Sequence, residues 1–455
     1  YGIEIPNAAE DRIEPQPGND LYISLDINIQ KYAEQAAYKV MEAKSAKNVK
    51  LIVMDPRDGK IYAMVNAPEF DLNDPYTLIN EIAQDYVGET LSNDQLLELL
   101  NGMWRNACIS DTYEPGSAFK IVTATAALEE NEVKLDDRFY CPGYKTVEDR
   151  IIRCHKAGGH GSQTFVEGIK NSCNPVFMEI GARVGAERMY DYYKRLGLFN
   201  RTGIDLPGEA NSIMHNLENV GAVELATMSF GQSFQITPLQ LLVAVSAVIN
   251  GGTLVTPHFG LQVKAPDGRV VKTFEYKTSD NVISKETSET MKKLLEAVVS
   301  DGTGKRAYLP GFRVGGKTAT SEKLPRRSGK YISSFIGFAP ADDPQVIALV
   351  LIDEPVGIYY GGTIAAPVIS ELFNNILPYL GIEERYTEEE EKEYKVGTFT
   401  VPDFVGKTRK EMKELLKIYD FDGIYTIGEG DVVIEQFPLP GEVVNRNSSL
   451  VLYYQ

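Results

Sequence analysis

Apolar and polar positions follow two different periods along this chain. Residues 29–44 place apolar side chains on one helical face, and residues 119–128 form an apolar run rich in Ala and Thr, so both segments are predicted to be helices. Residues 49–54 and 61–65 are strand-like and flank Asp-Pro-Arg-Asp-Gly, a sequence typical of a hairpin. Residues 21–25, 335–339 and 346–352 also predict strands. The mixture predicts an α/β (α+β) fold.

Two shifts in composition divide the chain into predicted domains. Residues 1–18 are polar and rich in Pro, which predicts an extended lead-in, and residues 386–396 are strongly acidic, which predicts a solvated linker. Residues 19–385 would form one large domain. Residues 397–455 would form a small one, with a helix over 408–418 followed by three short strands. A chain of 455 residues is long enough for two or three domains.

Charge and hydropathy exclude two classes of partner. The net charge of −18 argues against nucleic acid and against an anionic membrane surface. No apolar run reaches the roughly 18 residues typical of a membrane-spanning helix, so no span is expected within these 455 residues.

Ser117 and Lys120 are the first candidates for chemistry. They lie in Tyr-Glu-Pro-Gly-Ser-Ala-Phe-Lys, where the predicted helix begins, and positions i and i+3 share one helix face. A neutral amine beside the hydroxyl can take its proton, and the helix start supplies backbone donors for an oxyanion. Alone, this spacing occurs by chance in many chains, and an ordinary solvated helix start explains it equally well.

Two later motifs change that balance. Ser172-Cys-Asn lies in a loop-like stretch, and Gly315-Gly-Lys-Thr-Ala-Thr reads as the beginning of a strand. Ser-x-x-Lys, Ser-x-Asn and Lys-Thr-Gly, in this order, are the motifs of active-site serine β-lactamases and penicillin-binding proteins. Turn chemistry for Ser172 and Asn174, and β propensity for Thr318 and Thr320, are the structural alternatives.

The chain therefore resembles class B penicillin-binding proteins, which are peptidoglycan D,D-transpeptidases. Further matching stretches are the hairpin from Val53, Phe230-Gly-Gln-Ser-Phe-Gln-Ile-Thr-Pro-Leu-Gln and Tyr360-Gly-Gly-Thr. Val401-Pro-Asp-Phe-Val-Gly-Lys-Thr opens a stretch similar to a PASTA module. One such module, and a Cys inside the Ser-x-Asn motif, most resemble the sporulation-specific branch of the stage V sporulation protein D type.

The resemblance implies a transpeptidase fold, an αβββ PASTA-like domain and a role for each motif residue. Ser117 would attack the penultimate D-Ala of a stem peptide, with Lys120 as base. Ser172 would pass the proton to the leaving amine, and Asn174 would bind the substrate amide. Lys317 would keep the site positive. Thr318 and Thr320 would bind the substrate carboxylate, and the backbone amides of Ser117 and Thr320 would stabilise the oxyanion.

Further expectations follow from the same resemblance. Stem peptides and β-lactam antibiotics would be bound, and a membrane glycosyltransferase of the wall-synthesis complex would be a partner. The site would work at the extracytoplasmic face of the cell membrane, in spore development at the forespore membrane, with residues 1–18 as the remnant of a pedestal behind a membrane anchor. No cofactor is expected for the chemistry. Rival functions are a β-lactamase, a D,D-carboxypeptidase, and a catalytically silent sensor or structural protein.

Ala319 departs from the family pattern, since it replaces the Gly of Lys-Thr-Gly. Alternation puts Ala319 on the same strand face as Lys317. Its methyl group could narrow the approach to the strand edge and reduce β-lactam reactivity, or it could be a tolerated substitution.

The cysteines predict a second kind of site. Cys141, Cys154, His160 and Cys173 are separated by twelve, five and twelve residues, and a hairpin turning near Glu148 would bring Cys141 opposite Cys154. Thiolate and imidazole ligands suit a structural zinc ion. A Cys141–Cys154 disulfide and buried free thiols remain alternatives. His155, expected to point away from Cys154, is a weaker candidate ligand, and Cys108 reads as a small buried residue.

Overall fold

The computed structural model describes residues 17–455 except 89, 388–389, 391–397, 420, 422 and 446–447. The predicted lead-in, residues 1–18, and the predicted linker, residues 386–396, therefore lie largely outside the described residues. None of the described helices combines the length and apolar character needed to cross a membrane.

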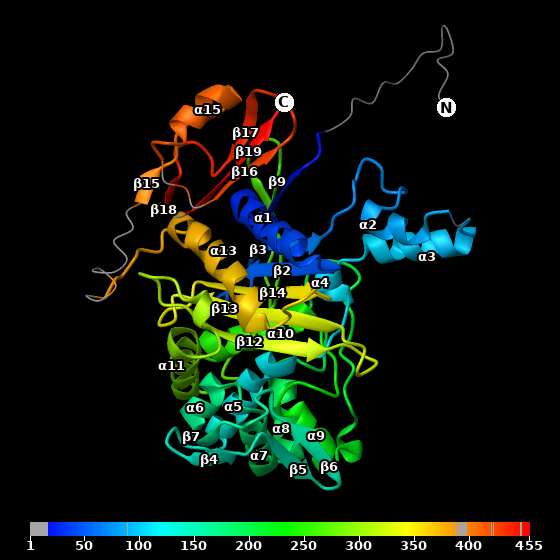
Figure 1. The fold of residues 1–455 in the computed structure, drawn as a ribbon, viewed down its shortest axis with the longest axis vertical. Helices are drawn as coiled ribbons and strands as arrows, with labels where there is room; N and C mark the ends of the chain where they lie inside the picture. Colours follow the sequence, from blue (N-terminus) through cyan, green and yellow to red (C-terminus); the bar gives the residue numbers. More distant parts are fainter. Residues whose placement is uncertain are drawn as a thin grey trace.

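A five-stranded antiparallel sheet forms the centre of the large unit (Figure 1). Its strand order is β12-β13-β14-β2-β3, so the two ends of this unit's sequence meet in one sheet. The five strands are β2 (Asn48–Met54), β3 (Ile61–Ala67), β12 (Gly315–Glu322), β13 (Tyr331–Ala339) and β14 (Val346–Asp353).

Both faces of this sheet are covered, which explains the continuous apolar runs in its strands. Every residue of β14 is buried, with alternate side chains entering different cores. Ile347 and Leu349 pack into the core formed with the helical lower half, whereas Val346 and Ala348 pack toward helices α1 (Ile27–Lys44) and α13 (Ala366–Tyr379). A strand that is buried on both faces has no solvent-facing side, so apolar and polar residues do not alternate along its sequence.

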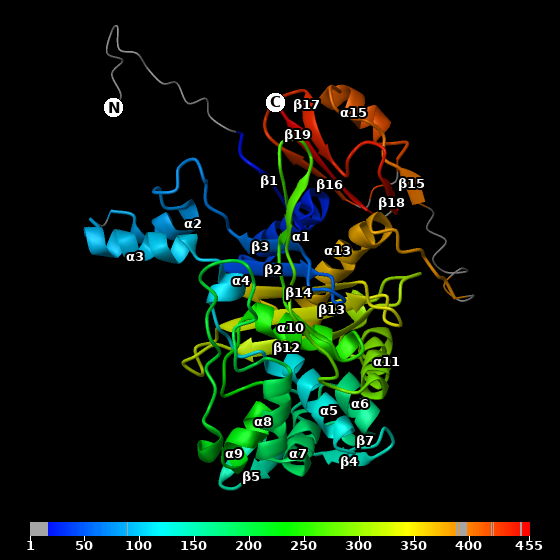
Figure 2. The same ribbon diagram turned by 180° about the vertical axis from the view of Figure 1, so that it is seen from behind.

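The lower half is mainly helical, and Figures 1 and 2 place it on the side of the sheet opposite α1 and α13. Two ribbons at its lower edge, β4–β7 and β5–β6, border these helices. The elements of this half are α5 (Lys120–Glu129), β4 (Arg138–Cys141), β5 (Tyr144–Val147), β6 (Arg150–Arg153), β7 (Gly161–Thr164), α6 (Phe165–Lys170), α7 (Asn174–Val184), α8 (Ala186–Arg195), α9 (Ala222–Met228), α10 (Pro238–Ile249) and α11 (Lys285–Asp301).

Smaller elements complete the large unit. A three-stranded sheet β1-β9-β10 and a two-stranded ribbon β11-β8 lie outside the central sheet. The remaining elements are β1 (Asp20–Ile23), α2 (Asn80–Ala83), α3 (Asn93–Trp104), α4 (Ala107–Ser110), β8 (Leu254–Val255), β9 (Gly260–Lys264), β10 (Val270–Thr273), β11 (Thr278–Ser279) and α12 (Gly361–Ile364).

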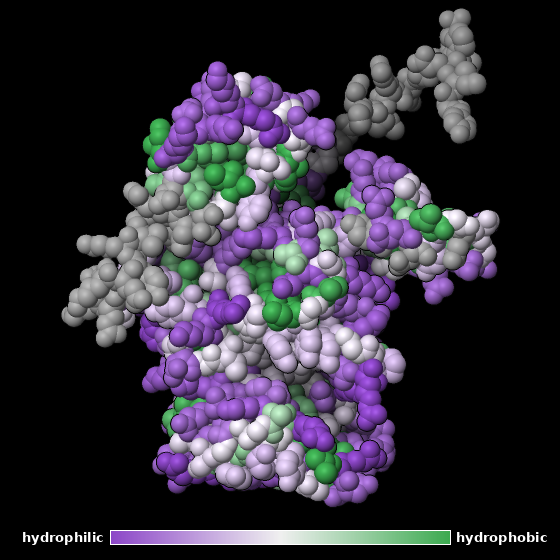
Figure 3. All heavy atoms as spheres, in the orientation of Figure 1, coloured by the Kyte–Doolittle hydropathy of each residue, from purple (hydrophilic) through white to green (hydrophobic). Residues whose placement is uncertain are grey.

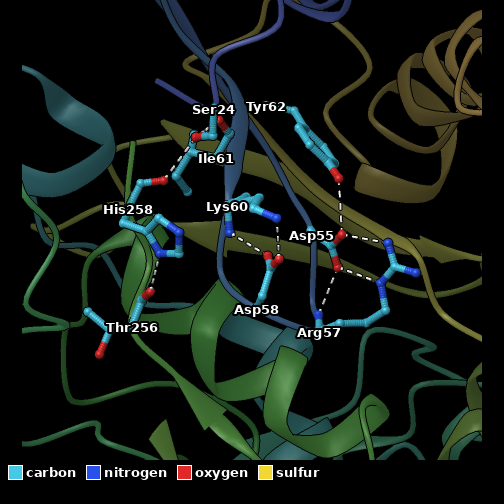
Figure 4. Close-up of polar contacts among 9 residues, drawn as sticks. All are labelled: Ser24, Asp55, Arg57, Asp58, Lys60, Ile61, Tyr62, Thr256 and His258. Carbon is cyan, nitrogen blue, oxygen red and sulfur yellow. Dashed lines mark hydrogen bonds and ion pairs between the residues drawn. The ribbon is translucent and has the colours of Figure 1, made fainter. Parts of the chain in front are cut away.

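The predicted hairpin between β2 and β3 is confirmed, and its turn is fixed by one buried carboxylate (Figure 4). Asp55 accepts hydrogen bonds from the backbone N and the guanidinium of Arg57 and from the Tyr62 hydroxyl, at 2.6–3.0 Å. Ser24 donates a 2.7 Å hydrogen bond to the carbonyl of Ile61, and Lys60 forms a β-bridge with His258. The hairpin thus connects β1 and the segment before β9 to the central sheet.

Residues 398–455 form a small unit with a core of its own, which includes Val401, Phe404 and Leu450. The predicted helix followed by three strands is confirmed by α15 (Arg409–Leu415) and the sheet β16-β19-β17. An additional ribbon pairs β15 with β18. Its strands are β15 (Thr398–Thr400), β16 (Gly423–Ile427), β17 (Val433–Phe437), β18 (Val443–Asn445) and β19 (Ser449–Tyr454). The surface seen in Figure 3 is mostly polar, with apolar patches on this unit.

The small unit packs against α1 and α13, across the central sheet from the helical half (Figures 1 and 2). The rings of Tyr32 and Phe437 meet edge to face with centroids 4.0 Å apart, and Val451 joins the core beneath α1 and α13. Lys31 pairs with Glu435 at the edge of this contact. Burying each large apolar side chain contributes about 1.5–3 kcal/mol to stability, so the buried Phe437 and Val451 stabilise the contact between the small unit and α1 and α13.

Candidate active site

Ser117 lies on a tight turn between the central sheet and the helical half. The predicted helix begins as a 3-10 turn over Gly116–Phe119 and continues as α5 from Lys120. Ser117 is partly exposed, whereas Lys120 is fully buried. The first turn therefore presents the hydroxyl at the surface of the site and keeps the amine inside it.

Lys120 reaches the Ser-Cys-Asn loop. Its Nζ donates hydrogen bonds to the Ser172 carbonyl at 2.7 Å, to the Ser172 hydroxyl at 3.2 Å and to Asn174 Oδ1 at 2.7 Å. Its Nζ also lies 5.4 Å from the centre of the Phe177 ring, at an apolar wall. The first two motifs are thus brought together as the sequence predicts.

Ser172 connects the second motif to the third. Lys317, fully buried on β12, donates from Nζ to the Ser172 hydroxyl at 2.8 Å, so one hydroxyl lies between two lysine amines. Ser172 has a φ of 52°, in the left-handed region that L residues rarely adopt. Such a conformation, placed between the end of α6 and the start of α7, is typical of a functional turn.

Burial sets the charge of the two lysines. Desolvation lowers the pKa of Lys120 to about 8, against the opposing electrostatic effect of the Cys173 and Cys154 side chains. Desolvation, followed by repulsion from Lys120, also lowers the pKa of Lys317 well below its usual value of 10.5. Two buried ammonium groups cannot easily coexist, so one amine is ready to accept a proton near neutral pH.

Thr318 and Thr320 lie on the opposite face of β12 from Lys317. Thr318 donates a 3.1 Å hydrogen bond to the Thr303 hydroxyl, and Thr320 accepts one of 3.0 Å from the backbone N of Gly361. Thr303 and Gly361 are site residues that the sequence analysis does not predict, although Gly361 lies in the family-like stretch Tyr360-Gly-Gly-Thr. Nothing in the sequence near either residue indicates which strand it meets.

Ala319 is 3% exposed and packs in the core of the helical half, on the same face of β12 as Lys317. Its side chain is directed toward the helical side of the site and away from the hydroxyls of its neighbours.

Cys141, Cys154, His160 and Cys173 form one cluster. Their ligand atoms all lie within 4.8 Å of one another, and Cys154 Sγ is 3.6 Å from His160 Nδ1. All four cysteines of the chain are free thiols in this structure. Because ligands about 2.3 Å from a tetrahedral zinc ion are separated by roughly 3.8 Å, the cluster needs only small shifts to fit that geometry.

The predicted hairpin is partly wrong about how the cluster forms. The turn does lie at Glu148, but the β5–β6 hairpin brings Cys154 to Gly143, whose carbonyl accepts its backbone N at 2.8 Å. Cys141 pairs instead with Gly161 in the β4–β7 ribbon, because the strand breaks at Pro142-Gly143. The expectation that His155 points away is also wrong, since its Nδ1 lies 3.8 Å from Cys154 Sγ.

Hydrogen bonding and burial set the protonation of three side chains of the cluster. A hydrogen bond from the Cys173 thiol lowers the pKa of Cys154 against the opposing effect of burial, and the same bond raises the pKa of Cys173. Burial lowers the pKa of His160, which keeps its imidazole neutral. A thiolate and a neutral imidazole are the forms that bind zinc.

The cluster is linked to the catalytic motif through the chain itself. Cys173 stands between Ser172 and Asn174, and the Asn174 amide donates a 3.1 Å hydrogen bond to the carbonyl of Arg153, the residue before Cys154. Any restraint on the sulfur atoms therefore reaches both polar side chains of the loop.

Two family models match the chain. The penicillin-binding protein transpeptidase domain matches residues 50–376, and the PASTA domain matches residues 399–455. Stage V sporulation protein D of Bacillus subtilis is 38% identical over 99% of this chain and 68% of its own length. The probable peptidoglycan D,D-transpeptidase PenA of Neisseria gonorrhoeae is 33% identical over 81% of this chain, which spans 58% of that protein.

Solved structures agree with these relatives. Penicillin-binding protein 3 of Mycobacterium tuberculosis, complexed with ampicillin, matches with a TM-score of 0.71 at 26% identity, covering 83% of this chain and 82% of that one. The apo transpeptidase domain of penicillin-binding protein 3 from Burkholderia pseudomallei matches with a TM-score of 0.66 at 26% identity, covering 80% and 98% of the two chains.

Proposed function

This chain belongs to the penicillin-binding protein transpeptidase family and carries a PASTA domain, and from that premise we propose that it is a serine-type peptidoglycan D,D-transpeptidase acting through Ser117. The observation that carries the proposal is the Ser172 hydroxyl, which receives hydrogen bonds from both Lys120 and Lys317. Three motifs distant in sequence thus form one proton network beside a partly exposed serine.

In the proposed reaction, Ser117 Oγ bonds to the carbonyl carbon of the penultimate D-Ala, and its proton passes to Lys120. The bond to the terminal D-Ala nitrogen then breaks, and the proton reaches that amine through Ser172. The backbone amides of Ser117 and Thr320 stabilise the oxyanion. An amine from a second stem peptide attacks the acyl-enzyme and releases Ser117, which gives ping-pong kinetics.

Substrate recognition is assigned to the two sides of the same site. Asn174 binds the substrate amide, and the hydroxyls of Thr318 and Thr320 bind the substrate carboxylate. Lys317 would add positive potential to the site in the state in which it is protonated and Lys120 is neutral. β-Lactams would form the same ester with Ser117, and the structural neighbours complexed with aztreonam and ampicillin support this.

A labelled penicillin tests the proposal. We expect a stable adduct that turns over slowly, because the acyl-enzyme waits for an amine. Rapid release of hydrolysed penicillin would instead indicate a β-lactamase, and the complete absence of an adduct would indicate a sensor or structural protein.

For the cysteine cluster we propose a structural zinc ion held by Cys141, Cys154, His160 and Cys173. The support is the donor set and the separation of at most 4.8 Å between ligand atoms. Four protein ligands leave no open position for water, so the ion would shape the Ser-Cys-Asn loop and take no part in acyl transfer, for which no cofactor is proposed.

The domains are proposed as a transpeptidase unit over residues 19–385 and a PASTA unit over residues 397–455, joined by residues 386–396. We expect truncation near Tyr386 to leave the acylation rate within a few-fold of the full chain, because the central sheet separates the PASTA unit from Ser117. Loss of the Tyr32–Phe437 contact should nevertheless lower the melting temperature. A folded truncate that no longer acylates would contradict this independence.

The relatives support a cellular setting for the proposed activity. We infer that the protein acts on the outer face of the cell membrane, where peptidoglycan lies. From the sporulation relative we also infer a role at the forespore membrane. A membrane glycosyltransferase that supplies the glycan strands is the proposed partner.

A further inference from the structure

A single ion pair ties the loop after β12 to the turn that carries Ser117. Arg326, in the β12–β13 loop, donates from Nη2 to both carboxylate oxygens of Glu114, at 2.6 and 2.7 Å. The Glu114 side chain is only 8% exposed, and that of Arg326 is 36% exposed. Because the Glu114 carboxylate is nearly buried, removal of Arg326 leaves its charge without this partner, which costs more than the loss of an ion pair at an open surface.

Glu114 belongs to the nucleophile turn and also holds a third segment. It lies three residues before Ser117, and its Oε1 accepts a 2.9 Å hydrogen bond from the backbone N of Ser233. Close by, the backbone N of Gly116 donates to the carbonyl of Gly231 at 2.9 Å. The Glu114 carboxylate thus connects the nucleophile turn to both the loop over residues 231–233 and the loop after β12.

The nucleophile turn is tightly packed between these neighbours. Gly116 has a φ of 54°, and a Cβ placed there would lie 2.4 Å from Ser321 Oγ of β12. A Cβ on Gly231, whose φ is 84°, would lie 2.1 Å from the carbonyl oxygen of Gly116. Because neither glycine has a Cβ, the backbone of the nucleophile turn approaches both β12 and the loop over residues 231–233 closely. The distance between β12 and the turn therefore depends on the contacts that join these three segments.

The loop after β12 is also hydrogen-bonded to the last residue of that strand. Arg326 Nη1 donates to the carbonyl of Glu322 at 2.6 Å, and the backbone N of Arg327 donates to Glu322 Oε1 at 2.6 Å. Glu322 is the last residue of β12, two positions beyond Thr320. The side chain of Arg327 forms no ion pair with a described residue, so this adjacent arginine is a matched control for the charge of Arg326.

We propose that Arg326 is a positioning residue for acyl transfer, which sets the separation of the two halves of the oxyanion site through Glu114. The proposal rests on the proposed function, in which one oxyanion donor is the amide of Ser117 and the other the amide of Thr320. These donors lie on different segments, and the Arg326–Glu114 pair joins them from the solvent side. A displacement of about 1 Å in such a site can cost roughly 10²-fold in rate.

The test compares Arg326→Gln with Arg327→Gln, which remove the same charge from adjacent positions of one loop. Acylation by a fluorescent penicillin is followed in rapid-mixing experiments that separate non-covalent affinity from the acylation rate constant. We expect Arg326→Gln to lower the rate constant about 10–100-fold with affinity little changed, and Arg327→Gln to match the wild type. Arg326→Lys, which keeps the charge, should recover part of the loss.

A double-mutant cycle separates positioning from a general effect on folding. Glu114→Gln should match Arg326→Gln, and the double variant should be no slower than either, because the same contact is lost. Melting temperatures are measured for every variant, and if Arg326→Gln does not fold, Arg326→Lys carries the comparison. An unchanged rate constant in the Arg326 variants, an equal loss in Arg327→Gln, or multiplicative losses in the double variant would overturn the inference. Wild-type protein that forms no adduct would instead refute the proposed function.

Discussion

Replacing Lys120 by Ala is expected to slow acylation of Ser117 by a β-lactam by about 10²–10⁴-fold, the usual contribution of a positioned general base. The side chain is fully buried and donates to the Ser172 carbonyl and to Asn174 Oδ1, so its removal also takes this donor from both oxygen atoms. Lys292→Ala is a matched control, because Lys292 is a buried lysine that bonds the carbonyl of Asp342. An equal loss in both variants would show that the effect comes from folding.

The pH dependence of acylation by the wild-type protein tests the role of Lys120 as the base. Lys120 accepts a proton only when neutral, and its pKa is lowered to about 8 by burial. The acylation rate should therefore rise with pH through about 8 and then level off, whereas an exposed lysine would place that rise near 10.5. A rate that falls across this range would exclude Lys120 as the base.

The second large effect is expected from removal of the zinc ion proposed for the cysteine cluster. Chelation, or Cys154→Ser, should lower the melting temperature by several degrees and slow acylation at the same time, because Cys173 holds the loop that carries Ser172 and Asn174. Cys108→Ser is the matched control, since Cys108 is equally buried and lies outside the cluster. Because its cluster is intact, Cys108→Ser should lose melting temperature on chelation as the wild type does, whereas Cys154→Ser should no longer respond to the chelator.

Metal analysis decides this prediction independently of activity. One equivalent of zinc is expected in freshly purified, reduced protein, and much less in Cys154→Ser. Negligible zinc in the wild type, or a Cys141–Cys154 disulfide found by peptide mapping, would contradict the site.

Local sequence signals predicted the elements but few of the contacts between them. The helix after Ser117, the β2–β3 hairpin and the helix of residues 408–418 follow from periodicity and turn residues, which act over a few positions. The contact between the PASTA unit and Tyr32 could not be predicted in this way, because nothing in the sequence near Tyr32 or Phe437 indicates that the two rings meet. The ribbon β15–β18 was missed since its strands have only three residues each.

The site shows the same division. Lys120, Ser172 and Lys317 could be grouped because their motifs are known to act together, and the structure brings the three side chains together. Thr303 and Arg326 could not be found, since each is an ordinary loop residue whose partner lies elsewhere in the sequence. The hairpin around Cys154 failed in register because Pro142 interrupts the strand, so Cys141 takes Gly161 as its neighbour.

Intact-mass spectrometry after incubation with a penicillin, followed by peptide mapping, tests the central claim most directly. The account predicts one added penicillin per chain, located on Ser117, and no adduct in Ser117→Ala that retains the wild-type melting temperature. An adduct on any other residue, or an adduct that persists in Ser117→Ala, would contradict it.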